Sequence, residues 1–167
     1  MKGGSCYFRC LSPSSYGRYF EELEPGQSFR HWPGRTIAEF DDTLFSSLSM
    51  NQHPVHIDEH FAAGTQHGRR LVEGPIVISL VIGMSQADIG GRASQTLEYL
   101  DVRHVGPVFH GDTIYAESTV LEKRDAGRPD AGIVKFKLVG KKPDGTVVVE
   151  IERTVLIKRK SHWLGRA

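Results

Sequence analysis

Cysteine is scarce in this chain: two occur among 167 residues, Cys6 and Cys10, and both lie in an opening stretch that also carries serine and glycine. This count argues against a disulfide framework and against a four-ligand zinc site. We therefore expect free thiols in a loosely held segment.

An excess of charge of one sign is also lacking. Lysine and arginine number 21 against 20 aspartate and glutamate residues, which leaves a formal net charge of +1. No global field then attracts nucleic acid or an anionic membrane, so any ligand must be recognised locally. The longest strongly apolar run, residues 76–82, is too short to span a bilayer, and residues 1–10 lack the apolar core of a secretory signal. We expect a cytoplasmic protein.

The length fits one domain with a single core. Residues 1–18 show no periodicity and predict a flexible N-terminal tail. Residues 19–160 carry the periodic patterns and form the predicted domain, and residues 161–167 form a C-terminal tail.

Two stretches predict helices. In residues 36–49, Thr36 and Glu39 fit a capping box, and apolar residues follow at helical spacing, which indicates a one-sided helix. Residues 74–88 place Pro75 at the first helical position and carry apolar residues on nearly every side, so this helix should be buried all round. Between them, Pro54 should interrupt regular helix, and residues 56–64 predict a short helix that Gly64 ends.

The second half of the chain predicts antiparallel strands. Apolar residues alternate with polar ones over residues 113–123, 132–142 and 147–159, and residues 97–108 predict a further strand that ends before Pro107. The tetrapeptide KPDG at 142–145 predicts a hairpin turn. Together these elements predict an α+β domain in which a sheet wraps a buried helix.

Three segments in this order resemble the MaoC-like, (R)-specific enoyl-CoA hydratase branch of the hotdog fold. They are SMNQHPVHID (49–58), LVEGPIVISL (71–80) and GPVFHGDTIYAESTVLEKR (106–124), which are similar to the family's Ser-Gly-Asp-x-Asn-Pro-x-His-x-Asp segment, its Val-His-Gly helix entry and its Pro-Val-x-x-Gly-Asp-Thr strand entry.

The resemblance implies an antiparallel sheet of five to six strands around one long buried helix, and a homodimer with active sites at its interface. It also implies an acyl-CoA or acyl-carrier-bound substrate, with no cofactor and no metal. The family's catalytic histidine corresponds to His56 and its helix glycine to Gly74, whereas its catalytic aspartate is replaced by Asn51 and its histidine before the glycine by Glu73.

Hydration of a 2-enoyl thioester needs a group that moves a proton and donors for the charge that collects on the thioester oxygen. An imidazole titrates near neutrality, so His56 can take a proton from water and return one to C2. Asn51 can orient a water but cannot ionise it; alternatively it only closes a turn with its own backbone. The alternative is that His56 only makes a hydrogen bond within the loop, but the resemblance favours catalysis.

At the start of the predicted helix 74–88, unpaired backbone N–H groups can receive a thioester carbonyl. Gly74 has no Cβ, so a ligand can approach these donors closely, although a glycine needed only for helix packing is the alternative. Glu73 either compensates for the missing aspartate at the helix mouth or merely interacts favourably with the helix dipole.

Three histidines in residues 50–62 raise the alternative of a metal site. His53, His56 and His60 lack a nearby cysteine and the H-E-x-x-H spacing, so we do not expect a metal. Basic residues could instead meet phosphates or a substrate carboxylate, or simply face solvent; the candidates are Arg69, Arg70, Arg92, Arg103 and residues 158–160.

The sequence therefore predicts a hydratase or dehydratase acting on a 2-enoyl-CoA or 3-hydroxyacyl-CoA. The Met-Asn pair before His-Pro-x-His is similar to a sub-branch associated with branched or dicarboxylic C5 acyl groups of the mesaconyl-, itaconyl- or methylmalyl-CoA type. Two alternatives remain open: a hotdog acyl-CoA thioesterase, for which Glu73 would be the acidic residue, and a non-catalytic acyl-CoA or acyl-carrier binding protein, in which Asn51 marks loss of the proton-transfer pair.

Overall fold

The computed structural model describes residues 16–163. Both cysteines and most of the predicted N-terminal tail lie outside the described residues, so the prediction of free thiols is untested. Of the predicted C-terminal tail, residues 161–163 belong to a short helix, α5 (Lys160–Trp163).

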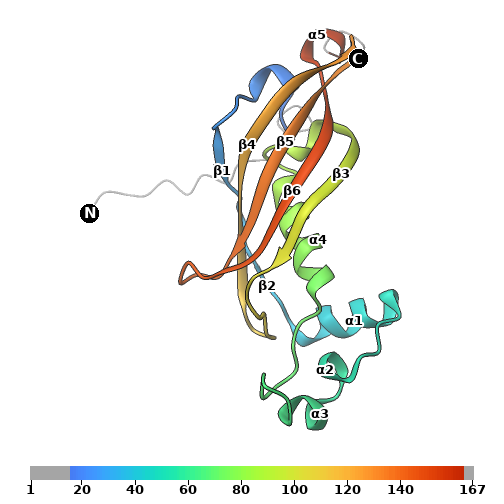
Figure 1. The fold of residues 1–167 in the computed structure, drawn as a ribbon, viewed down its shortest axis with the longest axis vertical. Coiled ribbons are helices and arrows are strands. Elements are labelled where there is room, and N and C mark those ends of the chain that lie inside the picture. Colours follow the sequence, from blue (N-terminus) through green and yellow to red (C-terminus); the bar gives the residue numbers. More distant parts are fainter. Residues whose placement is uncertain (1–15, 164–167) are drawn as a thin grey trace, which may run out of the picture.

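The described chain forms one curved sheet with helices on one side and at one end (Figure 1). Its strands are β1 (Ser28–Arg30), β2 (Arg35–Thr36), β3 (Ala93–His104), β4 (Thr113–Arg128), β5 (Ala131–Lys141) and β6 (Val147–Lys158). Its α-helices are α1 (Glu39–Ser49), α2 (Pro54–Ile57), α3 (Glu59–Ala63) and α4 (Gly74–Ser85), besides α5, and the 3-10 turns η2 (Phe20–Glu22) and η3 (Gly90–Arg92) complete the fold.

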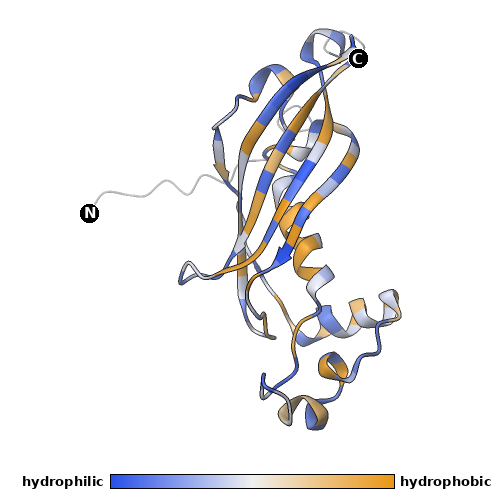
Figure 2. Cartoon of the chain, in the orientation of Figure 1, coloured by the Kyte–Doolittle hydropathy of each residue, from blue (hydrophilic) through white to orange (hydrophobic). Residues whose placement is uncertain are grey.

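The sheet is antiparallel, with the strand order β1-β4-β5-β6-β3 and with β2 pairing the start of β4. The predicted alternation is confirmed, because the residues predicted to share one face of β4 and β5 are buried against α4, and their neighbours face outward. Figure 2 shows this alternation as orange and blue bands along β4, β5 and β6. The predicted hotdog arrangement, a sheet around one long helix, is therefore confirmed.

The hairpin between β5 and β6 also follows the prediction. The Lys142 backbone N–H donates to the Thr146 carbonyl at 2.9 Å, and the Gly145 N–H donates back to the Lys142 carbonyl at 2.9 Å. Gly145 has a φ of 90°, which glycine adopts without strain. This turn fixes the end of the sheet nearest the start of β4.

Helix α4 is not buried all round in the single chain. Val77, Val81 and Ser85 are buried against the sheet, but Ser79 and Gly83 on the opposite side are exposed. The sheet curls around only one side of α4 (Figure 1), and half-buried apolar side chains flank the open stripe. The expectation of complete burial therefore fails for one chain alone.

Helix α1 is present, but two details of its prediction were wrong. Thr36 lies in β2 and pairs its hydroxyl with that of Thr113 at 2.7 Å; the helix begins three residues later, where the Ala38 N–H donates to the Asp41 carboxylate at 2.9 Å. In addition, the apolar face of α1 is exposed: Phe40 and Leu48 keep 70% and 75% of their surface. The buried face is polar instead.

The bounds of β5 and β6 were predicted to within one residue, and α4 starts at Gly74 as predicted. Strand β3 begins and ends four residues earlier than predicted, and β4 continues five residues further. The predicted helix 56–64 is two helices, α2 and α3, and Pro54 begins the first of them. Gly64 ends α3 as predicted. Strands β1 and β2, of three and two residues, were not predicted, since so short a segment shows no periodicity. Within residues 16–163, no helix is both long and apolar enough to cross a bilayer.

Candidate active site

The segment after α1 presents His56 on a single helical turn. Pro54 begins α2, and Nδ1 of His53 accepts a hydrogen bond from the Val55 backbone N–H at 3.2 Å. The half-buried His56 places its Nδ1 2.7 Å from the carbonyl oxygen of Leu71. Because a carbonyl can only accept, Nδ1 carries the proton and Nε2 keeps its lone pair. His56 is thus held in the tautomer that a proton acceptor needs.

Asn51 follows Met50, which ends α1 in the left-handed conformation with a φ of 60°. The Asn51 side-chain oxygen accepts from the His53 backbone N–H at 3.2 Å. This is the turn-closing geometry that the sequence left as an alternative. The amide oxygen is therefore committed to the loop, and the NH₂ group is the part of Asn51 that can contact a water or a substrate.

Gly74 begins α4 three residues after Leu71, the residue that holds His56. The ring of His104, at the end of β3, lies against this glycine: a Cβ added to Gly74 would lie 2.6 Å from Nε2 of His104. A side chain at position 74 would therefore displace the exposed His104 ring, and the first N–H groups of α4 lack helical partners. The segment 71–74 brings His56 and the N-terminus of α4 to the same end of the molecule.

Glu73 does not open onto the helix mouth. Its side chain is 1% exposed and accepts a hydrogen bond from the Ser46 hydroxyl at 2.5 Å, with the Ser49 hydroxyl at 3.5 Å. Both serines belong to α1, where Ser46 is buried and Ser49 is exposed. The carboxylate therefore joins α1 to α4 and does not face a substrate in this conformation.

Two residues that the sequence analysis missed complete this contact. Asp42, which is buried on α1, accepts from the Glu73 backbone N–H at 2.9 Å, and its other oxygen lies 2.9 Å from Nε2 of His110. The signal was present in the sequence: Asp42, Ser46 and Ser49 recur at helical spacing and form one polar stripe. Asp42 positions the turn that leads into Gly74.

Arg70 links the helices around His56. Its guanidinium forms ion pairs with Glu39 of α1 and, at 2.7 Å, with Glu59 of α3. The Arg70 side chain is mostly buried, and it holds the pKa of the Glu39 carboxyl below its ordinary value of 4.5. Arg70 is therefore a structural cation and is not free to meet a phosphate.

The other basic candidates lie in different places. The Arg69 guanidinium lies over the Phe109 ring, 4.0 Å from its centroid, close to the segment that holds His56. Arg103 is exposed and 3.6 Å from Asp101. Arg92, beyond the far end of α4, lies over Tyr19, and residues 158–160 are at that same distant end (Figure 1).

The described residues offer neither a metal site nor an accessible second catalytic cluster. Among residues 16–163, no three His, Cys, Asp or Glu side chains gather in a way that could hold a metal ion. His31 hydrogen bonds Asp88 through Nδ1 at 2.9 Å and Ser118 through Nε2 at 2.8 Å, which resembles a hydrolase triad. However, the Ser118 and His31 side chains are both buried, so Ser118 is not exposed as a nucleophile, and the cluster ties the segment that follows α4 to the sheet.

Comparisons with known proteins agree with this arrangement. The family described as MaoC like domain matches residues 20–141. A mesaconyl-CoA hydratase of Cereibacter sphaeroides is 28% identical over 86% of this chain, and an (R)-specific enoyl-CoA hydratase of Rhodospirillum rubrum is 33% identical over 83%. The solved structure of the R-hydratase PhaJ1 of Pseudomonas aeruginosa superposes with a TM-score of 0.73 at 28% identity and covers 87% of this chain.

The relatives differ in length. The chain covers 42% of the Cereibacter protein, which is less than half of it, but 91% of the Rhodospirillum protein and 88% of the solved PhaJ1 chain. The matched region contains the His56 loop, the start of α4 and strand β4, which are the segments that carry the resemblance. The chain therefore belongs to the MaoC-like domain family of the hotdog fold.

Proposed function

We propose that this protein is a hydratase or dehydratase that adds water to a 2-enoyl-CoA or removes it from a 3-hydroxyacyl-CoA. The observation that carries the proposal is the hydrogen bond from His56 to the Leu71 carbonyl, which leaves Nε2 basic beside the start of α4. Relatives named as hydratases and a dehydratase of CoA thioesters support the same reaction.

In the proposed reaction, His56 Nε2 removes a proton from water while the water oxygen bonds to C3 of the enoyl group. The electron pair of the double bond moves toward the thioester oxygen, and that proton is then delivered to C2. Backbone N–H groups at Gly74 stabilise the charge on the thioester oxygen, an effect worth about 3–4 kcal/mol for one well-placed donor. The NH₂ group of Asn51 orients the water.

We also propose a C5 acyl group with a branch or a second carboxylate as the substrate type. The relatives include proteins named mesaconyl-CoA hydratase and beta-methylmalyl-CoA dehydratase, at 25–31% identity. A second carboxylate needs a fixed cation, and Arg69, held over Phe109 near residue 71, is the one that lies close to the His56 loop.

The protein is further proposed to act as a homodimer. The exposed stripe of α4, the exposed apolar face of α1 and the edge strand β3 all lack a covering element within the described chain. Strand β3 exposes four large apolar side chains, Leu97, Tyr99, Leu100 and Val102, and Val105 just after the strand is also exposed. A second copy would cover all three surfaces.

The buried position of Glu73 bears on the thioesterase alternative. A carboxylate that directs water to the thioester carbonyl must reach the substrate, whereas Glu73 is enclosed by Ser46 and Ser49. The geometry thus favours addition of water at C3 over attack at C1.

The test is an assay with crotonyl-CoA, mesaconyl-CoA and itaconyl-CoA that follows both the loss of enoyl absorbance and the release of free thiol. A hydratase should lower the enoyl absorbance without releasing free thiol. Thiol release would instead identify a thioesterase, and no change in either would leave a binding protein. His56→Ala should lower the hydration rate by about 10²–10⁴-fold with the fold intact by circular dichroism, and a fully active variant would overturn the assignment.

A further inference from the structure

A groove of about 620 Å³ lies on the outer side of the sheet, away from α4. It is formed by the end of β1, the start of β4 and the β5–β6 hairpin, at the end of the sheet where α2 and α3 also lie (Figure 1). Its volume is within the range of about 300–1,000 Å³ that is typical of small-molecule sites. The proposed chemistry does not use this groove.

Aromatic rings form one part of the groove. Trp32 is 77% exposed, which is unusual for so large an apolar side chain, and Tyr115 lies beside it in the groove lining. Tyr115 is held in place by Gly34: a Cβ added there would lie 2.6 Å from the tyrosine ring. An exposed indole next to a fixed phenol offers flat faces on which a planar ring can stack.

Cations form the other part. Arg30, Lys141 and Lys142 line the groove together with a single carboxylate, Glu117. Glu117 lies 2.5 Å from Lys141 and 3.5 Å from Arg30, and Lys142 is paired with Asp112 at 2.8 Å. Two carboxylates therefore face three cations, which leaves one positive charge in excess. The Arg30 side chain is almost fully exposed and can turn toward a ligand. The groove therefore combines an excess of positive charge with aromatic faces, which suits a phosphorylated aromatic ligand.

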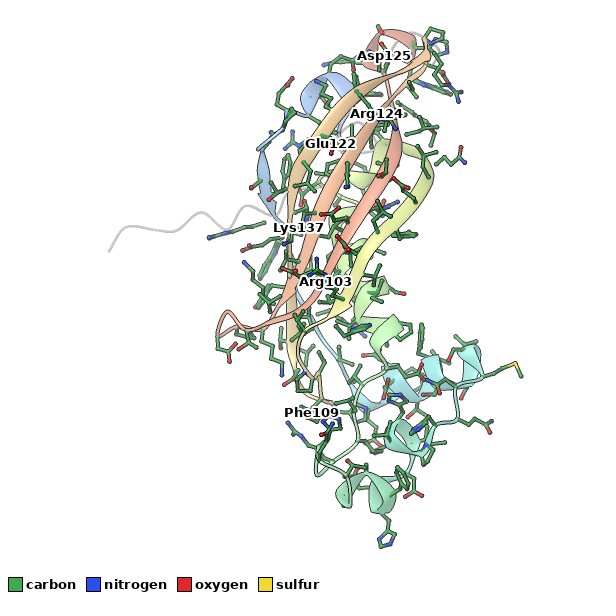
Figure 3. The ribbon with its side chains drawn as sticks, in the orientation of Figure 1. Arg103, Phe109, Glu122, Arg124, Asp125 and Lys137 are labelled. Atoms are coloured by element: carbon green, nitrogen blue, oxygen red, sulfur yellow. The ribbon has the colours of Figure 1, made fainter. Side chains whose placement is uncertain are left out.

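Phe109 connects this groove to the candidate active site. The Lys142 ammonium is 5.7 Å from the centroid of the Phe109 ring, and the Arg69 guanidinium covers the same ring. Phe109 in turn pairs with Leu71, whose carbonyl holds His56. Figure 3 shows Phe109 at the lower end of the molecule, beyond the sheet and on the side of α2 and α3. Contacts of Phe109 thus link Lys142, a groove residue, to the segment that holds His56.

We propose that this groove binds the adenosine 3′,5′-bisphosphate end of coenzyme A, with the adenine on Trp32 and the phosphates on Arg30, Lys141 and Lys142. The inference rests on the proposed function and deepens it, because it selects coenzyme A over a carrier protein as the holder of the acyl group. An exposed indole beside cations suits the flat base and the phosphates of a nucleotide. The pantetheine arm then passes Phe109 to reach His56.

The experiment compares two substrates that carry the same enoyl group: crotonyl-CoA and crotonyl-pantetheine, which lacks the nucleotide. Trp32→Ala and Arg30→Gln should each lower kcat/KM for crotonyl-CoA by about tenfold, in line with the loss of one stacked base or one phosphate contact. Both variants should leave kcat/KM for crotonyl-pantetheine unchanged. Both side chains are exposed, so the fold should be retained.

The other described tryptophan gives a matched control. Trp163 lies in α5 at the opposite end of the sheet (Figure 1), and Trp163→Ala should change neither substrate's kinetics. In a separate titration, adenosine 3′,5′-bisphosphate should quench the tryptophan fluorescence of the natural protein and of Trp163→Ala, but not that of Trp32→Ala.

The inference is overturned if Trp32→Ala affects both thioesters equally, affects neither, or leaves the fluorescence quenching intact. A third substrate, crotonyl-carrier protein, tests the alternative occupant. If Arg30→Gln lowers kcat/KM only for this substrate, the groove is a carrier-docking surface and the inference is overturned. A natural protein that hydrates no thioester but whose Trp32 still reports the bisphosphate would refute the proposed reaction while the nucleotide site stands.

Discussion

At the residue scale, the proton-transfer role proposed for His56 depends on one backbone carbonyl. The Leu71 oxygen accepts from Nδ1 and so defines which ring nitrogen is basic. The position of His56 was predicted from the sequence, because the motif around Pro54 is local. Its acceptor was not, since the contact joins residues 15 positions apart and depends on how the segment 71–74 returns past α2.

Asn51→Asp is predicted to keep or raise the hydration rate. An aspartate oxygen can accept from the His53 N–H as the asparagine oxygen does, so the turn should persist, and its second oxygen adds a proton acceptor. We expect kcat with crotonyl-CoA to change by a factor between one and about 100, measured by loss of enoyl absorbance. Asn51→Ala, which removes the turn acceptor, is the control and should be slower. A well-folded aspartate variant with reduced kcat would contradict the role given to this position.

Glu73→Gln is predicted to retain most of the activity. The glutamine oxygen can still accept from Ser46, and its NH₂ can donate to Ser49, so the link between α1 and α4 should hold. Glu73→Ala leaves the buried Ser46 hydroxyl without this acceptor and should lower the free energy of unfolding by about 1–3 kcal/mol, measured by urea denaturation. Loss of turnover in a stable glutamine variant would show that the carboxylate takes part in chemistry after all.

Asp42 and His110 show where residue-level prediction failed. The spacing of the apolar residues of α1 predicts an ordinary amphipathic helix, in which the polar stripe of Asp42, Ser46 and Ser49 faces solvent. Instead, the buried polar groups satisfy one another and the Glu73 backbone N–H. The choice between the two faces depends on what lies against α1, which no local pattern encodes.

At the element scale, β5 and the first half of β4 could be predicted because their buried and less buried residues alternate. Strand β6 was also predicted, although it buries several consecutive residues, whereas the end of β4 beyond residue 123 lacks the alternation and was not predicted. Their residues Ile114, Phe136 and Ile151 are all buried as the alternation required. Helix α4 was predicted from the same kind of signal, but its open side was not. An apolar helix looks alike in sequence whether its own sheet or a second chain covers it.

The two ion pairs of Arg70 join α1 to α3 on either side of the His56 loop, and Arg70→Gln should loosen both. We predict faster hydrogen exchange in residues 50–64 and a severalfold lower kcat/KM with the same substrate. Arg70→Lys, which keeps one charge, should recover part of the activity. Unchanged exchange in the glutamine variant would assign the rigidity of this loop to other contacts.

The ion pair between Arg70 and Glu39 makes the stability of this region depend on pH. Arg70 lowers the pKa of Glu39 in the folded protein below the ordinary 4.5, so the stabilising contact is complete above that value and is lost as pH falls through the lowered pKa. In acid titrations followed by hydrogen exchange, the natural loop should therefore loosen below about pH 4.5, whereas Glu39→Gln should already be looser at neutral pH and show less change. Parallel titration curves for the two proteins would argue against this source of acid sensitivity.

At the scale of the whole molecule, the uncovered apolar surfaces favour association with a second copy of the chain. Strand β3 forms one edge of the sheet, pairs only with β6 among the described strands, and exposes large apolar side chains between residues 97 and 102. Natural edge strands are usually short, charged or covered, because an exposed apolar edge recruits another chain. Pairing of β3 with β3 of a second copy would remove this edge and place apolar side chains of two chains together.

Val102→Lys is therefore predicted to separate the dimer. In sedimentation experiments, the natural protein should have about twice the 18.6 kDa chain mass, and the lysine variant about one chain mass, because a charge at an apolar edge disfavours pairing. Leu121→Lys, which changes a similarly exposed apolar residue on β4, is the matched control and should remain dimeric. The family resemblance implies active sites at the dimer interface, so we expect the separated variant also to lose most of its hydration rate and to recover it as its concentration is raised. A natural protein that sediments as one chain yet hydrates crotonyl-CoA would mean that β3 is covered by something other than a second copy.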